Sequence, residues 1–169
     1  MTTDPDNPCL SCPDTCCGIP GKFCLRLSKD EYDTHFRDKE QDILVIEKDK
    51  VIMIFSKEGK VCPNLNKKGC RIYLERPIDC RLYPYQMLPL YETRKKAKIL
   101  LYIKPECVEN KIFNIPINEA RALVEEFGRK VYGNKRIVVQ VFEDKFLAKL
   151  RNKIETLFVK FCQKLGINL

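Results

Sequence analysis

The apolar residues of this chain fall into short runs that predict β-strands more often than helices. Two β-branched, apolar runs, Ile43–Ile46 and Val51–Phe55, are separated only by the charged residues 47–50. This spacing is typical of a β-hairpin. Two later runs of the same kind, Ala97–Ile103 and Ile137–Phe142, are expected to form further strands.

Helix signals stand between these runs. Ser28 is followed three residues later by Glu31, which is the pattern of a capping box, and it predicts a short helix that ends near Asp38. A second helix is expected from Asn118, as its N-terminal cap, to about Tyr132. The domain should therefore contain both helices and strands.

The two ends of the chain differ in character. Residues 1–24 hold several Pro and Gly residues and show no periodicity, so a loop is expected there. After residue 143, apolar side chains recur on one face of a helix that should continue to about residue 165: Phe146, Leu150, Ile154, Leu157, Phe158, Phe161 and Leu165. We expect an α+β fold. Residues 1–110 should form a cysteine-rich loop core with short antiparallel strands, and residues 111–169 a mainly helical extension packed on it.

Composition limits the class of protein. The chain has 169 residues and 44% hydrophobic residues, which is ordinary for a globular domain. No apolar run approaches the roughly 20 residues that a membrane-spanning helix needs. The N-terminus lacks the basic and apolar regions of a secretory signal, so the cytoplasm is the expected compartment.

The net charge of +8 would suggest an acidic partner such as nucleic acid. However, the count treats thiols as neutral, and each four-thiolate site holding zinc or an oxidised four-iron cluster carries a charge of about −2. The one dense basic run, at residues 94–98, lies at the start of an expected strand, where a solvated edge is the usual role. We therefore expect no nucleic-acid binding.

Ten cysteines provide the main functional signal. Thiols stay reduced in the cytoplasm, which favours metal ligands over disulfides. Four cysteines lie within nine residues in the pattern C-x2-C-x3-C-C, and others follow further along the chain. Eight are candidate ligands of a metal or cofactor: Cys9, Cys12, Cys16, Cys17, Cys62, Cys70, Cys80 and Cys107. Eight thiols would allow two four-thiolate sites, and Cys107 is the weakest member of the set.

The spacing leaves the metal open between iron and zinc. Cys9 and Cys12 can face one ion from a tight turn, whereas the adjacent Cys16 and Cys17 point apart and suit two centres or a multinuclear one. The single histidine, His35, lies in the first expected helix, away from the cysteines along the chain. An all-sulfur donor set favours an iron–sulfur cluster by a small margin, with a four-iron, four-sulfur cluster preferred and zinc as the alternative.

Arginines surround the second group of cysteines. Arg71, Arg76 and Arg81 flank Cys70 and Cys80, where cationic groups would stabilise thiolates and offset the charge of a cluster. Surface ion pairs with the neighbouring Asp79 and Glu75 are a nearly equal explanation.

The run CLSCPDTCC, followed by CPNLNKKGCRIYLERPIDCRLYPY at residues 62–85, resembles the YkgJ-type cysteine-cluster family, the CxxCxxxCC zinc- or iron-chelating domain. The resemblance spans about residues 9–107. It implies metal chelation by the cysteines and no settled activity. Flagellin lysine methylases carry a similar cysteine cluster.

Three functions follow from these features. The first is a metal-binding protein with an iron–sulfur cluster that acts in electron transfer, redox sensing or metal handling, with metal ions and a redox protein as partners. The second is a zinc-stabilised interaction module. The third is a cluster-dependent enzyme related to the flagellin lysine methylases, although the chain has no glycine-rich nucleotide loop.

Overall fold

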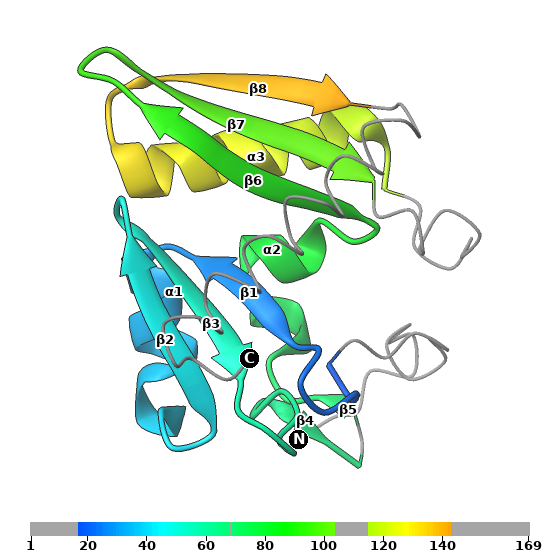
Figure 1. Cartoon of the computed structure of the whole chain (residues 1–169). Helices are drawn as coiled ribbons and strands as arrows, with labels where there is room; N and C mark the ends of the chain where they lie inside the picture. Colours follow the sequence, from blue (N-terminus) through cyan, green and yellow to red (C-terminus); the bar gives the residue numbers. More distant parts are fainter. Residues whose placement is uncertain (1–16, 68, 104–114, 143–169) are drawn as a thin grey trace.

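The computed structural model describes residues 17–67, 69–103 and 115–142, and these contain two three-stranded sheets with a helix beside each (Figure 1). In chain order the elements are β1 (Cys24–Leu27), α1 (Lys29–His35), the 3-10 turn η2 (Arg37–Lys39), β2 (Ile43–Lys48), β3 (Val51–Ser56), β4 (Leu65–Asn66), β5 (Gly69–Cys70), the 3-10 turn η3 (Tyr73–Glu75), α2 (Ile78–Arg81), β6 (Tyr85–Glu92), β7 (Lys96–Ile103), α3 (Ile117–Tyr132) and β8 (Arg136–Phe142). The predicted α+β class is confirmed.

The first sheet has the strand order β1-β3-β2, and all its neighbours are antiparallel. It contains the predicted hairpin, in which Lys48 pairs with Val51 across a two-residue turn. The turn residues Asp49 and Lys50 have φ values of 50° and 69°. Two positive φ values are what a type I′ turn requires, and this turn matches the twist of the flanking strands. Strand β1 lies at the edge of the sheet and was not predicted.

Helix α1 begins where the sequence predicted. The Ser28 side chain accepts a hydrogen bond from the Glu31 backbone, and the Glu31 side chain reaches back to the Ser28 N–H, so the capping box is present. The α-helix ends at His35, and the turn η2 continues the helical path to Lys39. The first core lies between this helix and the first sheet and consists of Phe23, Leu25, Leu27, Tyr32, Phe36, Ile43, Ile52, Ile54 and Cys62.

The second sheet has the order β6-β7-β8 and differs from the expectation in one respect. Strands β6 and β7 form an antiparallel hairpin, whereas β8 pairs with β7 in parallel. A parallel neighbour needs a crossover connection, and α3 lies within the connection between these two strands. The helix starts after Pro116, one residue before the expected cap Asn118, and ends at Gly133, where a φ of 64° suits glycine. Strand β6 was not predicted.

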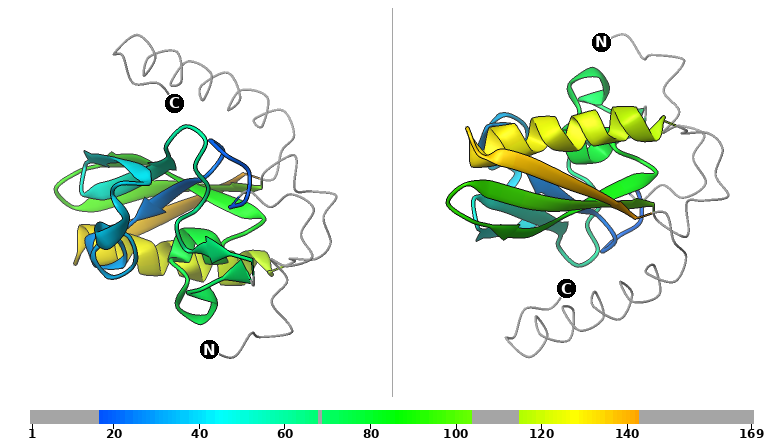
Figure 2. Two further views of the ribbon diagram at one scale, coloured as in Figure 1. Left: turned by 90° about the horizontal axis from the view of Figure 1, so that it is seen from below. Right: turned by 90° about the horizontal axis from the view of Figure 1, so that it is seen from above.

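Helix α3 covers one face of the second sheet, as the two views in Figure 2 show. The buried residues of this second core are Val51, Ile78, Leu82, Met87, Ala97, Ile99, Leu101, Ala120, Leu123, Val124, Phe127, Tyr132 and Val139. Val51 comes from the hairpin of the first sheet, and Ile78 and Leu82 come from the α2 segment. These three side chains carry the second core toward the first sheet, so the two sheets are packed together.

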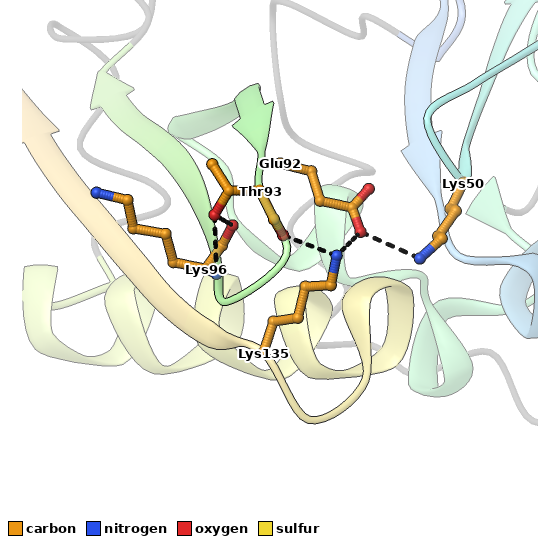
Figure 3. A network of polar contacts seen from close by, with 5 residues as sticks. All are labelled: Lys50, Glu92, Thr93, Lys96 and Lys135. Carbon is orange, nitrogen blue, oxygen red and sulfur yellow. Dashed lines mark hydrogen bonds and ion pairs between the residues drawn. The ribbon is translucent and has the colours of Figure 1, made fainter.

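A polar network also joins the two sheets at their turns (Figure 3). Lys50, in the β2–β3 turn, lies 3.1 Å from a carboxylate oxygen of Glu92 at the end of β6. The same oxygen accepts a hydrogen bond from Lys135, which precedes β8 and also donates to the Thr93 carbonyl oxygen at 2.8 Å. Glu92 is therefore the shared anion between two lysines from different parts of the chain.

Two expectations lie outside the described residues and stay predictions: the helix from residue 143 onward and the domain boundary near residue 110. Within the residues that the structure describes, no helix has both the length and the apolar character needed to cross a membrane.

Candidate metal centre

The two cysteine-rich segments meet at one end of the molecule. In Figure 1 the dark-blue start of the described chain lies beside the small β4–β5 ribbon. The Cys62 N–H donates a hydrogen bond of 2.9 Å to the Cys17 carbonyl oxygen. Cys62 is part of the first core, and Cys17 and Cys80 pack against the same core. Three thiols that are far apart in sequence are thus gathered at one apolar surface.

The β4–β5 ribbon brings a fourth cysteine to this end. Cys70 pairs with Leu65, which also packs against the first core, and Gly69 makes the tight turn with a φ of 98°. The cysteine at position 70 is thereby held beside the first core.

The buried side chain of Asn64 fixes this loop from inside. Its side-chain amide donates to the His35 carbonyl oxygen at 3.2 Å, and the backbone carbonyl oxygen of Asn64 accepts a hydrogen bond from the Arg71 N–H at 2.8 Å. The end of α1 and the cysteine loop are consequently held together by hydrogen bonds that a buried amide must make.

Cys80 lies on α2, a single helical turn after the break at Arg76-Pro77. Burial is the main cause that raises the pKa of the Cys80 thiol well above its ordinary value, and negative charge at Cys17 and at Asp79 raises it further. Cys70 acts in the same direction, so these thiols lie within electrostatic reach of one another. A bound metal cation would reverse this effect, because coordination removes the thiol proton.

The predicted arginines have different environments. The guanidinium group of Arg76 lies 3.8 Å from the centre of the Tyr73 ring, and its positive charge lowers the pKa of Cys80. Arg71 and Arg81 are exposed. Asp79, which the alternative explanation offered as a surface ion-pair partner, is buried and contacts Arg26 at 3.5 Å instead. Arg76 thus places its positive charge near a candidate ligand, as the sequence predicted for this group of arginines.

The structure places four of the eight candidate ligands: Cys17, Cys62, Cys70 and Cys80. Cys24, which is not a candidate ligand, is half-buried at the start of β1. The other four candidates, Cys9, Cys12, Cys16 and Cys107, lie outside the described residues. Within the described ranges alone, no group of three or more His, Cys, Asp or Glu side chains could hold a metal ion.

Sequence reasoning missed the buried polar residues in the segments beside the cysteines, namely Asn64, Glu31 and Asp79. Glu31 had a signal, because the capping box identified it, but the pattern gave it only a local role. Asp79 was assigned to the surface because an aspartate is seldom fully buried unless it is paired.

The donor set is chemically suited to a soft metal. The placed candidates are all sulfur ligands, they lie against an apolar core, and a cationic side chain stands nearby. The residues therefore fit zinc or iron.

Comparison with protein families supports this fit. The model of the CxxCxxCC family, described as "Putative zinc- or iron-chelating domain", matches residues 8–113. The match includes all eight candidate cysteines and every element from β1 to β7. No curated protein and no solved structure matches the chain.

Proposed function

Because the chain belongs to this family of zinc- or iron-chelating domains, we propose that its cysteines hold an iron–sulfur cluster used in electron transfer or redox sensing. Four of the proposed ligands lie among the residues that the structure describes: Cys17, Cys62, Cys70 and Cys80. The remaining four candidates are Cys9, Cys12, Cys16 and Cys107, and eight thiols would allow two four-thiolate centres. The sulfur donors would bind the iron, and the cluster would supply the one-electron chemistry.

The observation that carries the proposal is the meeting of three separate segments at one apolar surface. Cys17 precedes β1, Cys62 precedes β4 and Cys80 lies on α2, yet all three contact the first core. Several thiolates at an apolar surface repel one another and lose hydration, so they need a compensating cation. A metal centre provides that charge.

Four features favour an iron–sulfur cluster over a single zinc ion. The ligand set contains sulfur alone, and the neighbouring cysteines 16 and 17 suit a centre with more than one metal atom. The apolar core beside the thiols limits the access of water, which is one of the factors that set the potential of a cluster. Arg76 places a positive charge close to Cys80, which would stabilise an anionic cluster.

The test is purification of the full chain without oxygen, followed by iron, sulfide and zinc analysis. An iron–sulfur centre predicts a brown protein with equal amounts of iron and sulfide and an EPR signal in one oxidation state. Colourless protein that contains zinc alone would overturn the iron–sulfur proposal and leave the zinc-stabilised module. Oxygen must be excluded throughout, because an emptied thiolate site readily takes up zinc.

A redox role makes a further demand. The cluster must be reduced and reoxidised without loss of iron, which repeated spectra during a redox titration will measure. A cluster that decomposes on its first reduction would argue against electron transfer and for a structural role.

A further inference from the structure

Two buried carboxylates lie between α1, β1 and α2, beside the candidate metal centre. Glu31 and Asp79 have only 8% and 9% of their surface exposed. A buried carboxylate is costly unless donors satisfy its oxygens. Each carboxylate accepts a hydrogen bond from a backbone N–H that is distant in sequence, at Ile78 and at Arg26. Their role therefore extends beyond the capping of α1.

Glu31 uses its two oxygens for two different elements. Oε2 accepts from the N–H and the hydroxyl of Ser28, both at 2.9 Å, which is the capping box of α1. Oε1 accepts from the N–H of Ile78, the first residue of α2, at 2.8 Å. Pro77 precedes that helix and has no side chain that could cap it, so Glu31 supplies the acceptor from 47 residues away.

Asp79 makes the reverse connection. Its Oδ2 accepts from the backbone N–H of Arg26 in β1 at 2.8 Å, and the Arg26 guanidinium lies 3.5 Å from the same oxygen. β1 is an edge strand that pairs only with β3 in the described sheet, so one of its outward N–H groups is satisfied by α2. The Glu31 carboxylate of α1 thus binds the N-terminus of α2, and the Asp79 carboxylate of α2 binds the backbone of β1.

These crossed bonds determine where Cys80 lies. Cys80 follows Asp79 directly, and Ile78 is two residues before it on the same turn. β1 begins seven residues after Cys17. Fixing α2 against β1 therefore fixes the Cys80 segment against the segment that contains Cys17.

We propose that Glu31 and Asp79 are positioning residues of the metal centre: their hydrogen bonds to Ile78 and Arg26 hold the Cys80 thiol beside the Cys17 segment. This inference rests on the proposed function, because it needs a metal that the cysteines bind. The role is one of geometry, so it depends on hydrogen-bond acceptors and not on the negative charges themselves.

The two residues offer a sharp test because their amide isosteres should behave differently. Both contacts from Arg26 go to Oδ2 of Asp79, so Asp79→Asn can present its amide oxygen to Arg26 and keep the bond. Glu31 uses both oxygens, so Glu31→Gln must turn its NH2 group toward the backbone N–H of either Ser28 or Ile78, and each of these N–H groups can only donate. Positioning therefore predicts that Asn at 79 preserves the site and that Gln at 31 weakens it.

The experiment measures the release of the bound metal from the anaerobically purified full chain to excess chelator, followed by visible absorption and elemental analysis. Glu31→Ala and Asp79→Ala should release metal about tenfold faster or more, which is the usual effect of removing a group that orients a ligand. Asp79→Asn should stay within about twofold of the unaltered chain.

Ser28→Ala is the matched control. It removes the capping hydroxyl of α1 and should lower the melting temperature, but it leaves the bond from Ile78 to Glu31 in place. It should therefore release metal at the unaltered rate. If Ser28→Ala releases metal as fast as Glu31→Ala, or if both alanine variants match the unaltered chain, the positioning role is wrong.

A second readout separates this inference from the proposed function. In metal-free protein, alkylation of Cys80 mapped by mass spectrometry should be several-fold faster in Glu31→Gln than in Asp79→Asn. Equal rates would overturn the positioning role even if the chain binds metal. An unaltered chain that binds no metal would overturn the proposed function, while unequal alkylation would still show that the carboxylates hold the Cys80 segment. Glu31→Gln and Asp79→Asn change neither the size nor the shape of the side chain. The comparison of their alkylation rates can therefore be made even if an alanine variant fails to fold.

Discussion

The backbone N–H of Cys62 donates a hydrogen bond of 2.9 Å to the carbonyl oxygen of Cys17, so the two cysteine-rich segments are joined by their main chains. This bond does not depend on either thiol. It places both residues at the first core before any metal is considered, and Cys80 packs against the same core from α2. The protein scaffold therefore brings the candidate ligands together from both segments.

Replacement of single cysteines will identify the ligands. Cys62→Ser and Cys80→Ser should each lower the metal bound per chain to less than about half, because a hydroxyl is a poor ligand for a soft metal. Cys17→Ser should do the same if the second cysteine of the adjacent pair is a ligand. Metal content measured after anaerobic purification provides the test.

Cys24→Ser is the control for these variants, because Cys24 lies in β1 opposite Phe55 and is not a candidate ligand. It should retain the metal of the unaltered chain. Cys107→Ser tests whether Cys107, the weakest candidate, is a ligand. Unchanged metal content in Cys17→Ser or Cys107→Ser would remove that residue from the ligand set.

Removal of the metal should loosen the two cores unequally. The first core contains Cys62 and contacts Cys17 and Cys80, whereas the second core has no cysteine among its described residues. Binding energy at a metal site contributes to the folding of the segments that supply its ligands. Hydrogen exchange on chelator-treated protein should therefore show lost protection in β1 and β3 and retained protection in α3. Equal loss of protection in α3 would contradict this division.

The sequence predicted those elements whose signals are local. The β2–β3 hairpin needs only two apolar runs and a short polar interval, and α1 needs only the capping box at Ser28 and Glu31. Strand β6 escaped prediction because its apolar run is interrupted by Pro89, which the strand accommodates at a sheet edge beside a bulge. The parallel pairing of β8 depends on a crossover that no local pattern encodes.

The same distinction applies to the candidate site. Cysteine spacing selected the eight candidate ligands, since that spacing is a local property of the chain, and their binding of metal stays a prediction. It did not predict α2, because a single helical turn after Pro77 has little propensity to form by itself. That turn forms where Glu31 accepts the Ile78 N–H, a contact between residues 47 positions apart. Such contacts become visible only in the folded chain.

Gly128 tests the packing of α3 against β8. A Cβ at this position would lie 2.8 Å from Cγ2 and 2.9 Å from Cγ1 of Ile137, which is closer than carbon atoms pack. Overpacking of this kind costs about 1–3 kcal/mol, whereas replacing a helical glycine by alanine gains about 1 kcal/mol. Gly128→Ala should therefore lower the free energy of unfolding by about 1 kcal/mol, or the melting temperature by about 2–4 °C.

A second substitution checks the cause. In the Ile137→Ala background the clash is gone, so Gly128→Ala should be neutral or stabilising there. A cost that is the same in both backgrounds would show that the side chain of Ile137 is not responsible. Metal content should not change in any of these variants, since the contact lies in the α3–β8 part of the second core.

The ion pairs of Glu92 predict a dependence of stability on pH. Hydrogen bonding to Lys135 and then to Lys50 holds the pKa of Glu92 below its ordinary value. The folded-state pKa is thus lower than that of the unfolded chain, so the stabilisation is fully present above the unfolded value of about 4.3. It is lost as the pH falls through the folded-state pKa. Denaturant unfolding of the unaltered chain and of Glu92→Gln should therefore differ most at neutral pH and converge in acid.

High salt should reduce the difference in the free energy of unfolding between the unaltered chain and Glu92→Gln, because charges near the surface are screened. Glu47→Gln, on the exposed side of β2, controls for the loss of one negative charge outside the network. The Glu92 network links the β2–β3 turn to β6 and to the segment before β8, so its loss should weaken the contact between the two sheets. If Glu92→Gln and the unaltered chain keep a constant difference from neutral to acid pH, the lysines do not act through the charge of Glu92.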